Sequence, residues 1–204
     1  VNNKDVLPVV GIGIPNAPAM GDIDGDGVPE LFFNAIAARM TVLKADGSLY
    51  KVQLSSNKPA FGEKSNTREF STLSFIASPA LGDLDGDGKF EAILPTSGAN
   101  AALSMVKAYT RLDYEMNVSA WDLETGKMKP GFPQAIEDYV FFMNPLVVDV
   151  DGDGKKDVVA GSAGYFVHAW NVDGQEARGF PKLAGGWIAA TPTVGDMDGD
   201  GKLE

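Results

Sequence analysis

The 204-residue sequence contains no cysteine and a single histidine, His168. Without cysteine the chain has no disulfide bridge, no thiolate metal site and no cysteine nucleophile. One histidine cannot supply a zinc site built from three histidines. No run of about 18 apolar residues occurs, so the sequence predicts no membrane span.

Basic residues are also scarce, since 17 lysines and arginines stand against 28 aspartates and glutamates, which leaves a formal net charge of −11. This charge would repel nucleic acid phosphates and anionic membrane surfaces. Apolar residues make up 44% of the chain, which is ordinary for a protein that buries a core. We therefore expect a folded domain with no nucleic-acid partner.

Catalytic motifs are absent as well: the sequence holds no H-E-x-x-H, no G-x-S-x-G and no phosphate-binding loop. The string GSAG, residues 161–164, resembles a nucleophile turn only superficially and lies where a hairpin is expected. His168 lies in the strand-like string YFVHAW, and we interpret it as a structural or surface residue. Trp121, Trp170 and Trp187 are interpreted as core residues rather than as a sugar-binding platform. No catalytic residue is predicted in this segment.

The acidic residues, in contrast, are concentrated in four copies of one string. These read DIDGDGVPE (22–30), DLDGDGKFE (83–91), DVDGDGKKD (149–157) and DMDGDGKLE (196–204). Successive copies start 61, 66 and 47 residues apart, and a proline lies four positions before each. One copy alone could be an ordinary Asp-Gly turn, but four copies in the same register predict a shared structure.

The chemistry of this string, D-x-D-G-D-G-x-x-[DE], is that of a calcium loop. Carboxylates at positions 1, 3, 5 and 9 and a backbone carbonyl at position 7 are hard oxygen ligands, which suit calcium better than magnesium with its tight octahedron. We expect glycine at position 6 to adopt a positive φ and glycine at position 4 to avoid Cβ crowding. Up to four Ca²⁺ are predicted, with these ligands: Asp22, Asp24, Asp26, Val28 and Glu30; Asp83, Asp85, Asp87, Lys89 and Glu91; Asp149, Asp151, Asp153, Lys155 and Asp157; Asp196, Asp198, Asp200, Lys202 and Glu204.

The EF-hand is the rival for this motif, because it shares positions 1 to 7. It also requires a glutamate at position 12 and flanking helices. Position 12 is Phe33, Leu94 or Ala160 in the first three copies, and aliphatic or aromatic residues surround it. The EF-hand is therefore excluded, and each loop is expected to run into a strand.

The repeat extends beyond the acidic string. VSAWDLETGKMKPGFP (118–133) matches VHAWNVDGQEARGFP (167–181), and MTVLKADGS (40–48) occupies the same offset in the first unit. Short apolar runs with turn dipeptides, at periods of this length, favour the blades of a β-propeller. We predict an all-β fold, a single β-propeller segment over residues 1–204 built from four-stranded antiparallel blades. Its units are approximately 15–75, 76–141, 142–188 and a truncated 189–204, that is, about three complete blades plus the start of a fourth.

Two of these units carry extra residues, roughly 51–71 and 95–117, in different places. Loops that differ between otherwise similar repeats often carry recognition chemistry. We expect them to bind a protein or glycan partner.

The acidic string, with a proline before it and with A-W-x-x-[DT]-G and G-F-P after it, resembles the FG-GAP or VCBS-type repeat. This calcium-loop blade occurs in integrin α-subunit propellers and in many bacterial exported proteins. The resemblance covers essentially the whole chain, although Val148 replaces the glycine before the first aspartate of the third copy. It implies a β-propeller, usually of seven blades, with each calcium loop between the first two strands of its blade. Seven such units need more than about 300 residues, so we expect these residues to be part of a longer polypeptide together with its remaining blades.

Two classes of function follow from this reading. The first is a calcium-stabilised extracellular β-propeller that acts as a non-catalytic binding or assembly module for protein or glycan partners. The alternative is part of a secreted propeller enzyme, of the polysaccharide lyase or hydrolase type, with its catalytic residues outside this segment. Weaker calcium-binding modules have dissociation constants of about 10⁻⁴ to 10⁻³ M, which suit the calcium concentration outside cells. We therefore predict an extracellular, cell-surface or periplasmic location.

Overall fold

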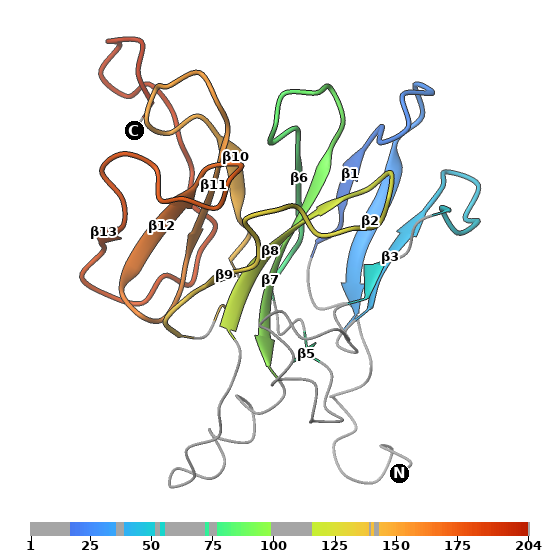
Figure 1. Ribbon diagram of the computed structural model, residues 1–204, viewed down its shortest axis with the longest axis horizontal. Helices are drawn as coiled ribbons and strands as arrows, with labels where there is room; N and C mark the ends of the chain where they lie inside the picture. Colours follow the sequence, from blue (N-terminus) through green and yellow to red (C-terminus); the bar gives the residue numbers. More distant parts are fainter. Residues whose placement is uncertain are drawn as a thin grey trace, which may run out of the picture.

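The computed structural model describes residues 17–35, 39–51, 54–55, 72–73, 77–98, 116–138, 140 and 143–203. Within these residues the chain folds into three antiparallel β-sheets and contains no helix, so the all-β prediction is confirmed (Figure 1). It follows that none of the residues described here forms a helix able to cross a membrane. Most of the predicted partner loop 51–71 and residues 99–115 of the second predicted loop lie outside the described residues.

The first and third sheets each have four strands in sequential order. The first contains β1 (Ala19–Gly21), β2 (Glu30–Ala35), β3 (Arg39–Leu43) and β4 (Leu54–Ser55). The third contains β10 (Leu146–Val148), β11 (Asp157–Gly161), β12 (Phe166–Trp170) and β13 (Lys182–Leu183). Both match the meander expected for a blade, in which each strand pairs with the next.

The second sheet has five strands instead of the predicted four. It contains β5 (Thr72–Leu73), β6 (Ala80–Gly82), β7 (Glu91–Gly98), β8 (Met116–Asp122) and β9 (Gln134–Ala135). Because β7 is 8 residues long, β6 pairs with its beginning and β5 with its last two residues. Residues 95–97 and 116–117, expected in an inserted loop, belong to the ladder between β7 and β8. Part of this insertion therefore lengthens a hairpin.

The sheets share their cores through alternate residues. Ala92 and Leu94 of β7 pack in one cluster with Phe32 of the first sheet, whereas Ile93 packs in another with Val158 of the third sheet. Successive side chains of a strand point to opposite faces, so the second sheet is covered on both sides. This explains why Glu91, the first residue of β7, is followed by a continuous apolar run rather than an alternating one.

The residues before the first two acidic loops lie close to the neighbouring part of the fold. A Cβ added to Gly82 would lie 2.5 Å from the Cβ of Val147 in the third sheet, and one added to Gly21 would lie 2.9 Å from the Phe90 ring of the second acidic loop. The neighbouring sheet therefore requires glycine at position 82, and at position 21 a larger residue would have to move the Phe90 ring. Val148 takes this place in the third sheet, where it packs in a separate apolar cluster.

Candidate metal centres in the acidic loops

The first three acidic loops each connect two antiparallel strands: β1 to β2, β6 to β7, and β10 to β11. All four acidic loops lie at the same end of the sheets, at the top of Figure 1. The fourth loop follows the third sheet, and its described residues up to 203 contain no strand. The loops thus form a row along one edge of the molecule.

The carboxylate at position 1 organises each loop by accepting the backbone N–H groups of the glycines at positions 4 and 6. In the third loop, Asp149 accepts from Gly152 at 2.8 Å and from Gly154 at 2.9 Å. The equivalent pairs of distances are 2.8 and 2.9 Å at Asp22, 2.8 and 3.0 Å at Asp83, and 2.6 and 2.9 Å at Asp196. The loop backbone therefore wraps around this one side chain.

The glycines at positions 4 and 6 permit that wrapping. Their φ angles all lie between 73° and 89°, a region that side-chain-bearing residues rarely adopt. The expected positive φ at position 6 is confirmed. The crowding reason expected for position 4 is wrong, because nothing lies within 4 Å of a Cβ added to Gly25, Gly86 or Gly152. The backbone conformation itself requires glycine at both positions.

The carboxylate at position 9 closes the base of each loop. Glu30, Glu91 and Asp157 are the first residues of β2, β7 and β11, and their exposed fractions are only 2–3%. Each accepts the N–H of the residue at position 2, at 3.0, 2.8 and 3.1 Å respectively. One buried negative charge is thus fixed beneath each of these three loops.

Positions 1, 3 and 9 bring their carboxylates together. The groups are Asp22, Asp24 and Glu30; Asp83, Asp85 and Glu91; and Asp149, Asp151 and Asp157, with ligand oxygens within 4.8 Å of one another in each group. In the fourth loop Asp196, Asp198 and Asp200 converge in the same way. Unit negative charges at such separations repel by a few kcal/mol per pair at an effective dielectric constant near 20. Each of these groups could hold a metal ion.

Position 5 behaves differently in the first three loops. Asp26, Asp87 and Asp153 are not members of the groups of converging carboxylates, and each accepts the N–H of the residue at position 7 at 2.7 or 2.8 Å. The backbone carbonyls of Val28, Lys89, Lys155 and Lys202 stay predicted ligands. Glu204 lies outside the described residues.

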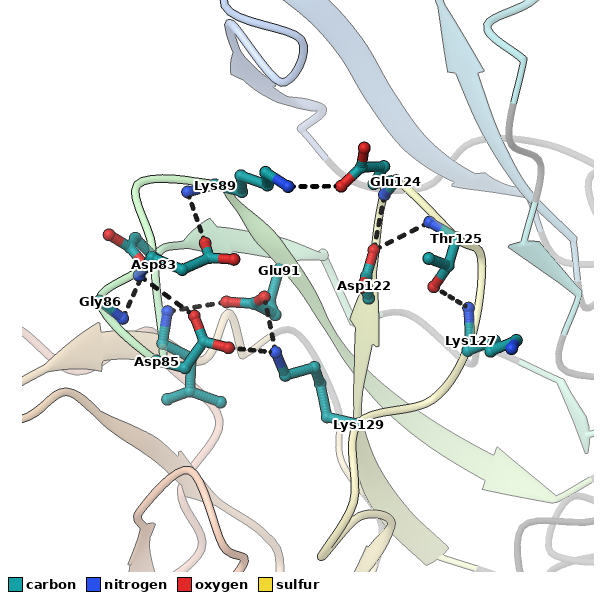
Figure 2. Close-up of polar contacts among 12 residues, drawn as sticks. Asp83, Asp85, Gly86, Lys89, Glu91, Asp122, Glu124, Thr125, Lys127 and Lys129 are labelled. Carbon is teal, nitrogen blue, oxygen red and sulfur yellow. Dashed lines mark hydrogen bonds and ion pairs between the residues drawn. The ribbon is translucent and has the colours of Figure 1, made fainter.

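The second loop contains a cation that the sequence reasoning missed. The ammonium of Lys129, which follows β8, lies 2.5 Å from Asp85 Oδ2 and 3.1 Å from Glu91 Oε1 (Figure 2). Lys129 stands 38 residues after Glu91 along the chain. The only signal in the sequence was the position of Lys129 just before the repeated Gly-Phe-Pro turn. This position does not show that Lys129 lies near the acidic loop unless the pairing of the strands is known.

The carboxyl groups of the second and third loops therefore differ in pKa. The hydrogen bond from Lys129 holds the pKa of Asp85 below its usual value, whereas burial raises the pKa of Glu91 in spite of the same lysine. In the third loop, burial raises the pKa of Asp157 to about 6, and the charge of Asp151 adds to the effect. Among the described residues, no lysine contacts the buried Asp157 as Lys129 contacts Glu91.

His168 is held between two glutamates. Its Nε2 lies 2.7 Å from Glu137 Oε1, and its Nδ1 bonds Glu176 Oε1. Its exposed fraction is 7%, and its ring stacks on Trp170 with ring centroids 4.9 Å apart. Both ring nitrogens are engaged, which agrees with the structural interpretation of this residue.

The tryptophans divide into two groups. Trp121 and Trp170 are 9% and 3% exposed, as expected for core residues, but Trp187 is 70% exposed, so the core prediction was wrong there. The side chain of the next residue, Ile188, fills the space above Gly161 of β11. Ile188 therefore covers the third sheet in place of its neighbour.

The family of FG-GAP-like repeats matches residues 149–204. This range begins at the first aspartate of the third acidic loop, includes β11 to β13 and ends with the fourth loop. The repeat recognised from the acidic string is therefore present in this part of the chain. A search of curated proteins found no match.

Proposed function

Taking the FG-GAP-like repeat as the premise, we propose that this chain is a calcium-stabilised β-propeller segment that serves as a non-catalytic binding or assembly module outside the cytosol. One observation carries the proposal: a group of three converging carboxylates lies at the same end of each of the three sheets. Carboxylates in such numbers suit calcium, which takes six to eight oxygen ligands.

Calcium would act on folding through charge. The carboxylates at positions 1, 3 and 9 would hold the ion, with those at position 5 and the carbonyls at position 7 completing the shell. The ion would offset the mutual repulsion of these groups and the burial of Glu30, Glu91 and Asp157. Because position 9 begins the second strand of its sheet, the ion would tie the loop to the sheet.

The propeller part of the proposal is supported by the way the sheets stack. Residues on opposite faces of the second sheet enter two different cores, one shared with the first sheet and one with the third. Radial repetition of such four-stranded units is how a propeller protects its sheet edges. The first and third sheets follow this pattern, and the longer β7–β8 hairpin modifies it in the second.

The binding part rests on the segments that differ between repeats, approximately 51–71 and 95–117, for which a protein or glycan is the proposed partner. A rigid scaffold with variable loops is a common arrangement for recognition. A location outside the cytosol follows if the loops bind calcium with dissociation constants of about 10⁻⁴ to 10⁻³ M.

Thermal unfolding with and without calcium tests this proposal. Excess chelator should lower the melting temperature by several degrees, and added calcium should restore it, because a ligand that binds only the native state contributes about 2.7 kcal/mol at 100 times its dissociation constant. Asp149→Asn should reduce the calcium response. Asp173→Asn, which removes an exposed carboxylate outside the acidic loops, should not. A melting temperature unchanged by excess chelator would contradict the proposal.

A further inference from the structure

The second acidic loop already holds a positive charge where a metal ion would have to bind. Lys129 Nζ contacts Asp85 and Glu91, which are two of the three converging carboxylates of this loop (Figure 2). The Lys129 side chain is only 13% exposed, so its ammonium lies among the carboxylates rather than in solvent. The contact is therefore part of the loop and not a surface ion pair.

The other sheets have no lysine at the equivalent place. The N–H of Lys129, in the hairpin that follows β8, donates to the carbonyl of Ala120 in β8, and the N–H of Ala177, in the hairpin that follows β12, makes the same bond to Ala169 in β12. Tyr50 occupies this place in the first sheet. The same hairpin position thus carries an ammonium in the second sheet, a methyl group in the third and a phenol in the first.

Other cations near the first and third loops are placed differently. Lys44 lies 3.8 Å from Asp24 with 42% of its side chain exposed. The Arg178 guanidinium donates to the backbone carbonyl of Asp151 at 2.7 Å. Among the described residues, neither contact joins a cation to the buried carboxylate at position 9, as Lys129 does with Glu91.

An ammonium and a divalent cation cannot share one set of carboxylates without strong repulsion. An ion entering the second loop would have to displace Lys129, which takes the ammonium away from two of its partners. The lysine side chain has a flexible four-carbon stem, so displacement is feasible but costs binding free energy. The first and third loops carry no such cost.

We infer that Lys129 is a built-in cation of the second loop, which keeps that loop closed without calcium and makes it bind calcium more weakly than the first and third loops. This inference rests on the proposed calcium binding by the acidic loops. The four copies are nearly identical in sequence, yet they would differ in their response to calcium. The second loop would keep its structure without calcium, whereas the others would be stabilised by it.

Calorimetric titration of the chelator-stripped chain with CaCl₂ tests the inference, using wild type, Lys129→Met and Lys127→Met. Methionine keeps the apolar stem and removes the ammonium. Lys129→Met should bind one more calcium ion than wild type with high affinity. Alternatively, the number of ions stays the same and the dissociation constant of the second loop falls at least tenfold. Lys127→Met removes an exposed positive charge from the same hairpin and should titrate as wild type does.

Thermal unfolding of the same three proteins gives a second readout. Without calcium, Lys129→Met should melt at a lower temperature than wild type, and calcium should raise its melting temperature by more. If Lys129→Met and wild type bind calcium with the same stoichiometry and affinity, the inference is overturned while the proposed function stands. If no protein takes up calcium, both are overturned.

Discussion

The second and third acidic loops have nearly the same backbone but different charges around their carboxylates. In both, the position 1 carboxylate accepts two glycine N–H groups and the position 9 carboxylate is buried. In the second loop Lys129 lies among the carboxylates, whereas in the third the pKa of Asp157 rises to about 6 because of burial and neighbouring aspartates. Lys129 comes from a hairpin outside the motif, so two similar acidic motifs can have different charges around their carboxylates.

The residue before each loop adds a second difference. Gly82 leaves no room for a side chain beside Val147, whereas Val148 packs in an apolar cluster of the third sheet. The backbone of the acidic loop is therefore common to both sheets, while charge and packing around it are local. The predictions below exchange these local features.

The largest effect is expected from exchanging the residues before the two loops. Gly82→Val should destabilise the chain by about 3 kcal/mol, because overpacking a filled site forces neighbouring strands apart. Val148→Gly should cost about 1–2 kcal/mol, since it removes part of an apolar cluster and adds backbone freedom. Urea denaturation in the presence of calcium measures both. Equal costs for the two variants would show that the second and third sheets are packed alike at this place.

A smaller effect, different in size in the two loops, is expected from neutralising position 9 in chelator at pH 8. Asp157→Asn should stabilise the metal-free chain by up to about 2 kcal/mol, because it removes a buried charge whose pKa is raised from 3.8 to about 6. Glu91→Gln should stabilise it less, because burial also raises the pKa of Glu91 but the substitution removes the charge pair with Lys129. Chemical denaturation measures the difference.

Calcium should reverse the benefit at Asp157. The Asp157→Asn variant loses a predicted ligand, so its stability should rise less than that of wild type when calcium is added. If both substitutions at position 9 change the stability of the metal-free chain to the same extent, the electrostatic contrast between the loops is not real.

The sequence predicted the loops well because each is determined by its own nine residues. Positive φ at Gly154 and the convergence of Asp149, Asp151 and Asp157 depend on local spacing, which the printed sequence displays. The strand meanders of the first and third sheets were accessible for the same reason, since apolar runs and turns alternate at regular intervals.

What the sequence could not predict depends on contacts between distant residues. Lys129 reaches Asp85 across two strands, and Gly82 is required by a valine of the next sheet. The exposure of Trp187 depends on which of two neighbouring apolar residues covers β11. These features require knowledge of how strands pair and sheets stack, which no single motif carries.

The smallest effect, and the one that should not distinguish the loops, is expected at position 4. Gly86 and Gly152 have φ angles of 77° and 73°, and nothing lies within 4 Å of an added Cβ at either. Alanine at each should therefore cost only the strain of the left-handed backbone, about 1 kcal/mol, and the same amount in both loops. Urea denaturation of Gly86→Ala and Gly152→Ala in chelator measures these costs.

Asparagine provides the control for this last experiment, because it tolerates the left-handed region better than alanine. Gly86→Asn and Gly152→Asn should each be less destabilising than the corresponding alanine variant. If alanine destabilised one loop clearly more than the other, the two loops would differ in backbone conformation as well as in charge. Equal losses of stability in the two loops would show that the loops differ only in the side chains around them.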